Sequence, residues 1–452
     1  MTDKTPSIHG QWSSRFAFIL AATGSAVGLG NIWKFPYITG ENGGGAFVLV
    51  YLICVLLIGI PIMIAEIMLG RRGQKNPIDT MQTLASQSKA DPRWQYLGWM
   101  GIIAGFLILA YYSVIAGWSM AYVTKGFFGS FSGADATTIK ALFDNLMASP
   151  IQQIFWHSAF MVVTMQVVMR GVQGGLEKTV RFLMPALFVI LFLLIAYAMS
   201  SGAYQQGIHF LFNPDFSKIN SSSVLTAMGH AFFTLSLGMG AIMVYGSYLP
   251  KDVSIAKTTF IIAGADTLVA LLAGIAIFPL VFANNLVASA GPGLIFQTLP
   301  LAFGHMTGGW LFGFLFFMLL FFAALTSSIS LIEPAVAWLI ENKNIDRKQA
   351  CIWSGSVCWA LGVGVVLSFN TWSEFKLFGK NLFELLDYLT ANLMLPLGGL
   401  GLAVFAGWVL SQKDAQQELA LPEQGFQAWQ LLIKYVAPGS VFLVFLHVVG
   451  VL

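Results

Sequence analysis

Long apolar segments, separated by short polar ones, make up most of the sequence. A helix that crosses a bilayer needs about 20 apolar residues, and eleven segments meet this requirement. They lie near residues 15–38, 43–69, 96–124, 152–169, 180–200, 224–248, 258–285, 309–340, 350–369, 382–410 and 427–450. Several exceed about 25 residues, a length that favours tilted helices. The pattern predicts an all-α polytopic membrane protein with eleven transmembrane helices in one domain, residues 1–452.

Glycine-rich stretches interrupt the first and the sixth of these segments near their middle. The first stretch covers residues 24–31 and the second covers residues 236–240. Glycine readily leaves helical geometry, and unwound backbone at membrane depth is tolerated only where protein buries it or where it lines a cavity. The two breaks therefore predict a binding site formed by helix ends within the membrane.

The two breaks also occupy matching places in two sets of five segments, residues 11–200 and 224–411. Because five is an odd number, the second set enters the membrane from the opposite side, which is typical of an inverted repeat. We expect a 5+5 inverted repeat in which helices 1 and 6 are discontinuous, followed by an eleventh helix at 427–450. Residues 286–308 read as a structured loop between the seventh and eighth segments.

Charged residues are sparse, at 10% of the chain, while 57% of it is hydrophobic. The net charge is only +3 and no basic patch is interleaved with aromatic residues, so we expect the lipid bilayer as a partner and no nucleic acid. Most Lys and Arg residues outside the segments lie on the side of the N-terminus, which predicts a cytoplasmic N-terminus and an extracytoplasmic C-terminus. We expect a multi-pass protein of the cell inner (plasma) membrane. No nucleophile–base pair, phosphate loop or metal cluster is present, so an enzyme is not expected.

The sequences around both breaks resemble motifs of the neurotransmitter:sodium symporter family, and look most like its bacterial, leucine-transporter-like amino-acid branch. The motifs are QWSSR at 11–15, GSAVGLGNIWKFPY at 24–37, ENGGGAF at 41–47, FFTLSLGMG at 232–240 and AALTSS at 323–328. The resemblance runs from about residue 11 to 450. It implies a secondary symporter that couples an amino-acid substrate to sodium by alternating access.

The same resemblance implies two sodium sites built from oxygen atoms at the broken helices. One site would use Gly24, Val27, Ala323, Thr326 and Ser327. The other would use Ala26, Asn31, Thr234 and Asp266, together with the substrate carboxylate. For Thr326 and Ser327 the alternative is a hydroxyl that bonds back to its own helix.

The substrate site that the resemblance implies lies between the two breaks. The substrate carboxylate would meet the amides of Leu29 and Gly30, at a half-helix N-terminus that favours negative charge, and the hydroxyl of Tyr112. The ammonium would meet carbonyls around Ala26, Phe233 and Thr234 and the Ser236 hydroxyl, and the side chain would meet Ile108, Phe233, Met239, Ser327 and Leu331.

Two positions in this site indicate the kind of substrate. Gly28 stands where monoamine-transporting relatives carry an aspartate, so the ligand should bring its own carboxylate, which favours an L-amino acid. Met239 stands where close relatives often have phenylalanine, and methionine is unbranched and adaptable. We expect a preference for neutral hydrophobic amino acids, including aromatic ones. The alternative is that Met239 only fills the core.

Asp266 lies inside the seventh segment, where the family usually has a sodium-coordinating asparagine. A carboxylate at this depth is costly and usually functional. Chloride-dependent relatives use a glutamine and a serine at positions that hold His230 and Ala270 here. A fixed negative charge can replace the halide, so we expect no chloride requirement. Two sodium ions are expected, one at each of the two sites above. The alternatives are a structural pair of Asp266 with His230, a proton-coupled transporter with Asp266 as the titrating group, and a transport-inactive sensor or channel.

Five further residues align with the gates of the family. Lys34 and Asp387 match an extracellular Arg–Asp gate. On the cytoplasmic side Trp12 is retained, His9 replaces an arginine and Glu341 replaces its aspartate partner. If His9 and Glu341 pair, inward opening should vary between about pH 6 and 7; the alternative is a solvated histidine on a flexible tail.

Two further acids, Glu66 and Glu333, lie in or near membrane segments. We expect both to hold helices together, or to cap hydrogen bonds, and not to contact substrate.

Overall fold

The computed structural model describes residues 12–286, 293–448 and 451. These residues form helices and connecting segments, with only two isolated β-bridges between single residues. The helices of the first half are α1 (Arg15–Ala26), α2 (Phe35–Glu41), α3 (Gly45–Cys54), α4 (Ile60–Gly73), α5 (Pro77–Gln87), α6 (Gln95–Phe127), α7 (Ala136–Ala148), α8 (Pro150–Met169) and α9 (Lys178–Met199). The second half holds α10 (Tyr204–Phe212), α11 (Ser221–Thr234), α12 (Ala241–Ser247), α13 (Ile255–Ala283), α14 (Leu299–His305), α15 (Gly309–Lys343), α16 (Arg347–Leu367), α17 (Leu382–Asp387), α18 (Leu395–Val404), α19 (Gln412–Leu419), α20 (Glu423–Leu431) and α21 (Ala437–Val448).

Several of these helices are continuous through a short π-helical turn. Such turns extend α2 back to Gly30, join α3 to α4, extend α9 back to Val172, and join α17 to α18 and α20 to α21. Nine of the eleven predicted segments coincide with one helix or with consecutive helices of this kind, and the first and sixth each hold two helical parts separated by a non-helical break. The fifth segment starts earlier than predicted because polar residues and glycines, which the apolar pattern does not reach, form the turn Val172–Glu177.

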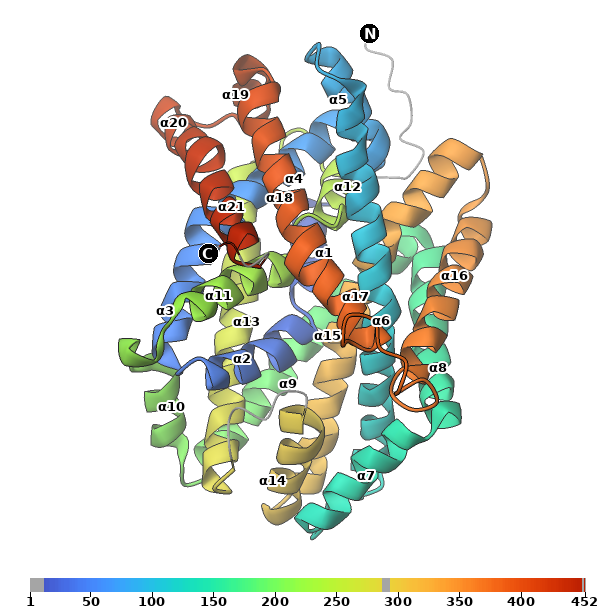
Figure 1. The fold of residues 1–452 in the computed structure, drawn as a ribbon, viewed down its shortest axis with the longest axis vertical. Coiled ribbons are helices and arrows are strands. Elements are labelled where there is room, and N and C mark those ends of the chain that lie inside the picture. The colour runs from blue at the N-terminus through green and yellow to red at the C-terminus, as the bar shows by residue number, and fades with distance from the viewer. Residues whose placement is uncertain (1–11, 287–292, 449–450, 452) are drawn as a thin grey trace.

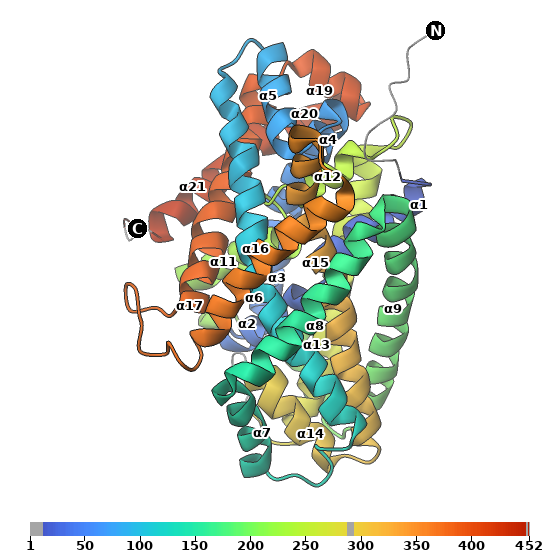
Figure 2. The same ribbon diagram turned by 90° about the vertical axis from the view of Figure 1, so that its right-hand side faces the viewer.

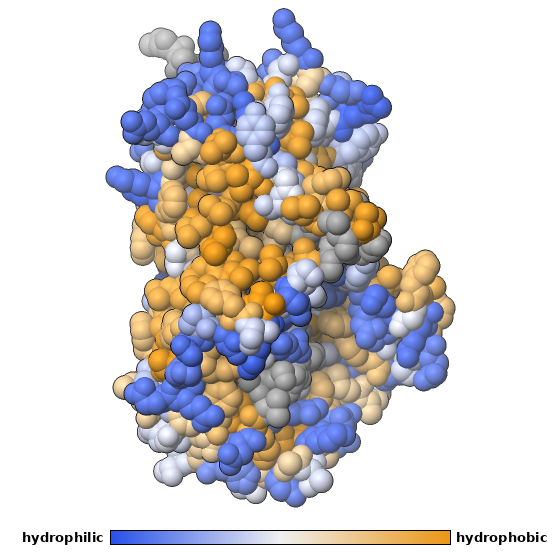
Figure 3. Space-filling model, turned by 60° about the vertical axis from the view of Figure 1, so that its left-hand side comes forward, coloured by the Kyte–Doolittle hydropathy of each residue, from blue (hydrophilic) through white to orange (hydrophobic). Residues whose placement is uncertain are grey.

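Seven helices in the described part of the chain are long and apolar enough to cross a membrane. The number is eight if α1 and Gly30–Glu41, which bend by 47° at their junction, form one span. The predicted total of eleven transmembrane helices therefore stays a prediction, whereas the all-helical membrane fold is confirmed. On the face shown in Figure 3, a mainly apolar band lies between two more polar ends, as expected of a membrane protein.

Five short helices lie outside the predicted spans: α5, α7, α10, α14 and α19. Of these, α14 falls in the region that was expected to be a structured loop. The helix α10 packs against α13, and a side-chain carbon at Gly207 would lie only 2.6 Å from Pro279. These elements cover the ends of the long helices.

The long helices α6 and α15 pack along each other, and α1 contacts α9, α12, α13 and α15. Figure 1 shows α1 near the middle of the molecule, and Figure 2 shows that it runs inward from one side, starting beside one end of α9. Close packing here depends on glycine, because a side-chain carbon at Gly101 of α6 would lie 3.1 Å from the Gly240 amide nitrogen. Small residues let membrane helices approach closely, and this contact places α6 against the second predicted break.

Candidate substrate and ion site

The first predicted break is present at the end of α1. The helix starts at a cap in which the Ser14 hydroxyl accepts from the Ala17 amide, and it ends at Val27, whose ψ of 105° is extended. The chain turns at Gly28 and becomes helical again from Leu29. The break therefore leaves the carbonyl end of α1 and the amide end of the following helix near each other in the protein interior.

The second break separates α11 from α12 and is more strained. Gly238 and Gly240 have positive φ values of 75° and 74°, and Ser236 has a φ of 55°. A left-handed conformation is unfavourable for a residue other than glycine. Two contacts hold this segment: the Ser236 hydroxyl donates to the Ser25 carbonyl at 2.9 Å, and the Gly238 amide donates to Glu66 at 3.1 Å. Glu66 thus supports the break, as expected for a structural acid.

The residues predicted to bind the substrate carboxylate, which are Leu29, Gly30 and Tyr112 and are called the carboxylate seat below, lie at the first break. The Leu29 amide donates to the Tyr112 hydroxyl at 3.1 Å. A side-chain carbon at Gly28 would lie 2.4 Å from the Ser327 Oγ and 2.8 Å from the Tyr112 hydroxyl. Only glycine therefore fits at position 28 without moving these two hydroxyls.

Two predicted site residues, Asn31 and Thr234, contact the carboxylate of Asp266, which is fully buried. The Asn31 amide donates to its Oδ1 at 2.7 Å, and the Thr234 hydroxyl lies 3.1 Å from both of its oxygens. Asn31 also accepts from the Gly28 amide at 2.9 Å. His230 does not join this group, because neither of its ring nitrogens has a hydrogen-bond partner among the described residues. The alternative of a structural Asp266–His230 pair is therefore wrong.

Oxygen atoms of the other predicted sodium site also converge. The Ser327 Oγ lies 3.4, 3.1 and 3.3 Å from the carbonyl oxygens of Gly24, Ser25 and Val27. The Thr326 hydroxyl donates back to the Ala323 carbonyl at 3.0 Å. This bond to its own helix is the alternative that was considered for Thr326. Thr326 also lies at the site, because its Cβ would be 3.3 Å from a side-chain carbon added at Gly24. A set of uncharged carbonyl and hydroxyl oxygens fits a hard cation such as sodium.

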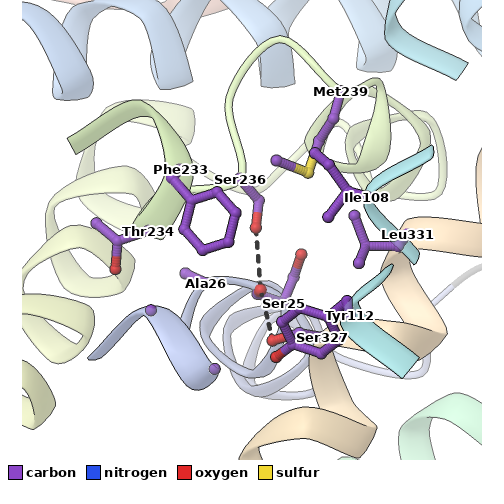
Figure 4. Close-up of a pocket in the computed structure, with 12 residues that line it drawn as sticks. Ser25, Ala26, Ile108, Tyr112, Phe233, Thr234, Ser236, Met239, Ser327 and Leu331 are labelled. Atoms are coloured by element: carbon purple, nitrogen blue, oxygen red, sulfur yellow. Dashed lines mark hydrogen bonds between the residues drawn. The ribbon is translucent and has the colours of Figure 1, made fainter. Parts of the chain in front are cut away.

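A buried cavity of about 20 Å³ separates the two breaks (Figure 4). It is lined by Ser25, Ala26, Gly28, Gly30, Ile108, Tyr112, Phe233, Thr234, Ser236, Met239, Ser327 and Leu331. Every residue that the sequence assigns to the substrate is in this set except Leu29. In Figure 4, Met239, Ile108 and Leu331 lie together on one side and Phe233 lies opposite them. The volume holds about one water molecule, so these side chains must separate to admit a larger ligand.

Sequence reasoning missed Ser25 as a site residue. Its carbonyl accepts from Ser236, and its hydroxyl donates to Ser330 at 2.7 Å. It therefore joins both breaks and α15. One feature of the sequence could have identified it: Ser25 lies inside the first glycine-rich stretch, between two residues already assigned to ions.

A second cavity of about 90 Å³ lies beside the first and is lined by Lys34 and Asp387 among others. Tyr112 and Phe233 line both cavities and so separate them. Beyond them, the Lys34 Nζ lies 3.9 Å from Asp387 and 4.8 Å from the centre of the Phe233 ring. Lys34 and Asp387, which were predicted to form the outer gate, thus lie close together, and Lys34 contacts the Phe233 ring that lines both cavities.

At the opposite end, Trp12 is buried and its indole nitrogen donates to the Tyr245 carbonyl at 3.1 Å. Glu341 accepts from the backbone amide and the side-chain amide of Asn76 at 3.0 and 2.6 Å. His9 lies outside the described residues, so its predicted pairing with Glu341 stays a prediction.

The last predicted structural acid, Glu333, is fully buried near this end of the molecule. It accepts from Tyr248 at 3.1 Å and pairs with Arg347 at 2.5 Å. It holds helices together, as expected.

A bundle of membrane helices in which two broken helices face one buried, oxygen-lined cavity is the architecture of a secondary transporter. The chain belongs to the Sodium:neurotransmitter symporter family, whose sequence profile matches residues 9–141 and 146–451. This confirms the resemblance seen in the sequence. Members of this family are sodium-dependent membrane transporters and not enzymes.

Known proteins resemble the chain over nearly its whole length. An uncharacterized sodium-dependent transporter of Bacillus subtilis, YhdH, is 37% identical and covers 98% of each chain. An uncharacterized sodium-dependent transporter of Haemophilus influenzae is 35% identical over 96% of this chain and 97% of its own. Among solved structures, MhsT in complex with L-phenylalanine matches with a TM-score of 0.91 and 43% identity, covering 97% of this chain and 99% of that one.

Proposed function

We propose that this protein is a sodium-coupled symporter of neutral hydrophobic L-amino acids, aromatic ones included, and that it needs no chloride. The observation that carries the substrate class is the cavity between the breaks. It combines the backbone amides and the Tyr112 hydroxyl at the first break with an apolar wall that includes Met239. The similar protein MhsT, crystallised with L-phenylalanine, supports the same class.

In this proposal the substrate spans the two breaks. Its carboxylate faces the amides of Leu29 and Gly30 and the Tyr112 hydroxyl. Its ammonium faces the carbonyls at Ala26 and Phe233 and the Ser236 hydroxyl. Its side chain displaces Met239 from the opposite wall, where methionine has the flexibility to move.

Two sodium ions are proposed, one on each side of the first break. The oxygens of Gly24, Val27 and Ala323 with the hydroxyls of Thr326 and Ser327 would bind one ion. The group around Asp266 would bind the other, with Ala26, Asn31 and Thr234. Because the substrate carboxylate completes this second set, ion and substrate stabilise each other in the closed cavity.

The proposal that chloride is not needed rests on the charge of Asp266. Its carboxylate lies fully buried beside the proposed ion, with only hydrogen-bond donors from neutral side chains around it. Ala270, which is also buried, offers no hydroxyl that would bind a halide. The fixed negative charge therefore balances the cation within the protein.

Orientation is part of the proposal. The ends of α4, α8, α13 and α16 that carry most of the Lys and Arg residues would face the cytoplasm, together with the N-terminus. The cavity beside Lys34 and Asp387 would then face the outside. The inner bacterial membrane is the expected location.

Uptake of radiolabelled amino acids into proteoliposomes tests this function, with sodium and chloride varied separately. We expect uptake of tryptophan, phenylalanine and leucine driven by a sodium gradient, with no large fall when gluconate replaces chloride. If a pH gradient drives uptake in the absence of sodium, the protein is instead a proton-coupled transporter in which Asp266 is the titrating group. Binding of amino acid without counterflow would indicate a sensor.

A further inference from the structure

A groove of about 570 Å³ lies between α8 and α16, away from the substrate cavity. Figure 1 shows these two helices side by side at one edge of the bundle, and this edge faces the viewer in Figure 2. Three methionines of α8, Met161, Met165 and Met169, line it from one side. Cys351 and Trp359 of α16 line it from the other. The groove is therefore mainly apolar and opens on the membrane-facing surface.

Two hydrogen bonds fix the helices at the two ends of the groove. At the deep end, the Trp359 indole nitrogen donates to the Ser158 hydroxyl at 2.8 Å. At the other end, the Arg347 guanidinium donates to the Val168 carbonyl at 2.7 Å. Between them, Gly355 of α16 lets Met165 pack directly against the helix backbone, since a side-chain carbon there would lie 2.8 Å from the Met165 sulfur. Contacts between the two helices thus fix the shape of the groove.

The length of the groove matches one leaflet of a bilayer. It extends along α8 from Ser158 to Met169, which at 1.5 Å per residue is roughly 16 Å. Half of a hydrocarbon core about 30 Å thick is about 15 Å. In the proposed orientation Met169 is at the cytoplasmic surface and the Trp359–Ser158 contact is near the middle of the membrane. The groove therefore has the depth of one acyl chain of the inner leaflet.

The charge at the cytoplasmic mouth is positive. Arg170 follows the last residue of α8, and Lys348 is the second residue of α16; both are exposed, and neither forms an ion pair with a described residue. Arg347 is already paired with the buried Glu333. The nearby Asp346 carboxylate caps the helix, where it accepts from the Gln349 amide at 2.7 Å. Its negative charge offsets only one of the two cations, so the mouth keeps a net positive charge.

From this combination we propose that the α8–α16 groove binds an anionic phospholipid of the inner leaflet. One acyl chain would lie along the three methionines, and the phosphate would face Arg170 and Lys348. Basic pockets between helices on the cytoplasmic side are suited to anionic headgroups, and flexible methionine side chains adapt to an equally flexible chain. A second copy of the protein is less well matched, because the surface is concave and positive at its mouth.

Native mass spectrometry of the full-length protein, delipidated in detergent, tests the proposal with two probes, dioleoyl-phosphatidylglycerol and dioleoyl-phosphatidylcholine. We expect the first bound phosphatidylglycerol to be favoured about tenfold or more, since each basic residue near an anionic lipid contributes on the order of 1 kcal/mol. The double variant Arg170→Gln/Lys348→Gln should lose this preference. Lys251→Gln/Lys257→Gln removes the same charge at another exposed site on the cytoplasmic side and should keep it.

A second pair of variants tests the groove itself. Gly355→Leu should fill it and lower binding of both lipids several-fold, whereas Gly264→Leu adds the same side chain to an exposed position of α13 with open space around it. As a measurement that does not depend on this variant, brominated phosphatidylglycerol should quench tryptophan fluorescence less in Trp359→Phe than in the unsubstituted protein.

Three results would overturn the proposal. The first is equal binding of the two lipids, and the second is an equal loss of phosphatidylglycerol binding in both charge variants. The third is a dimer in the unsubstituted protein that Gly355→Leu dissociates without any change in lipid binding, which would assign the groove to a second copy.

Discussion

The Asn31 side-chain amide and the Asp266 carboxylate meet at 2.7 Å, which joins the first broken helix to α13. Both side chains are fully buried. Because a carboxylate only accepts hydrogen bonds, Asn31 must present its nitrogen to Asp266 and its oxygen to the Gly28 amide. The break in α1 and the acid on α13 are thereby held in one arrangement.

Removing the charge of Asp266 should weaken sodium binding. We expect Asp266→Asn to raise the sodium concentration for half-maximal uptake about tenfold, equivalent to ~1.4 kcal/mol, and to make uptake respond to chloride. Sodium titration of uptake in chloride and in gluconate measures both effects. Asp252→Asn, at an exposed residue, is the control; a chloride response in neither variant would contradict the proposed role of the charge.

The Tyr112 hydroxyl should contribute to substrate affinity. Tyr112→Phe removes the group that contacts the Leu29 amide, and loss of a hydrogen bond to a charged carboxylate costs about 1.5–3 kcal/mol. The substrate concentration for half-maximal uptake should therefore rise at least tenfold. The neighbouring Tyr111 places its hydroxyl 3.5 Å from Thr390, away from the seat, so Tyr111→Phe should have a smaller effect. If both variants changed the substrate concentration for half-maximal uptake equally, Tyr112 would not contact the substrate carboxylate.

Space at Gly28 should be essential for the closed site. Gly28→Ala forces a carbon atom to 2.4 Å from the Ser327 hydroxyl, so we expect binding of both sodium and amino acid to fall sharply. Binding of radiolabelled leucine at saturating sodium measures this. Gly264→Ala, with no atom within 4 Å of the added carbon, should bind normally. Normal binding by Gly28→Ala would show that Ser327 moves aside freely.

The side chain at position 239 should set the size of the accepted substrate. Met239→Phe puts a stiffer ring beside Ile108 and Leu331 in a cavity that is already small. Competition assays should then show weaker binding of tryptophan and phenylalanine than of leucine or alanine. An unchanged order of competitors would mean that Met239 only fills the core.

The buried pair of Glu333 and Arg347 should matter for stability more than any exposed pair. Arg347→Met leaves the fully buried Glu333 carboxylate without its cation, a change that costs about 3–5 kcal/mol in buried pairs. Arg93→Met removes a cation from an exposed pair with Asp91, where solvent screens the charges and little loss of stability is expected. Thermal unfolding in detergent compares the two, and similar melting temperatures would contradict the prediction.

Much of the fold follows from the apolar pattern, because each membrane helix must be apolar along its length. The breaks were also visible, since glycines cluster at 28, 238 and 240 inside otherwise apolar segments. The short helices α7 and α14 were not predicted, because they lie outside the long apolar segments, where length and hydropathy give no signal. The role of Ser25 was missed for a different reason: it acts mainly through its carbonyl oxygen, which every residue carries.

The groove between α8 and α16 was equally invisible in the sequence. It depends on the pairing of two segments that lie far apart in the chain, for instance Ser158 with Trp359, which are 201 residues apart. The resemblance to a known family supplied the roles of Asn31 and Thr234, whereas their contacts with Asp266 came only from the structure.

The contact between Ser236 and Ser25 has a consequence for ion leak. Ser236 keeps a left-handed backbone while its hydroxyl binds the carbonyl of Ser25 on the other broken helix. Rearrangement of either break therefore disturbs the other. In the proposed symport cycle, this contact between two serines that were assigned to neither ion would restrain slippage, in which sodium crosses without substrate.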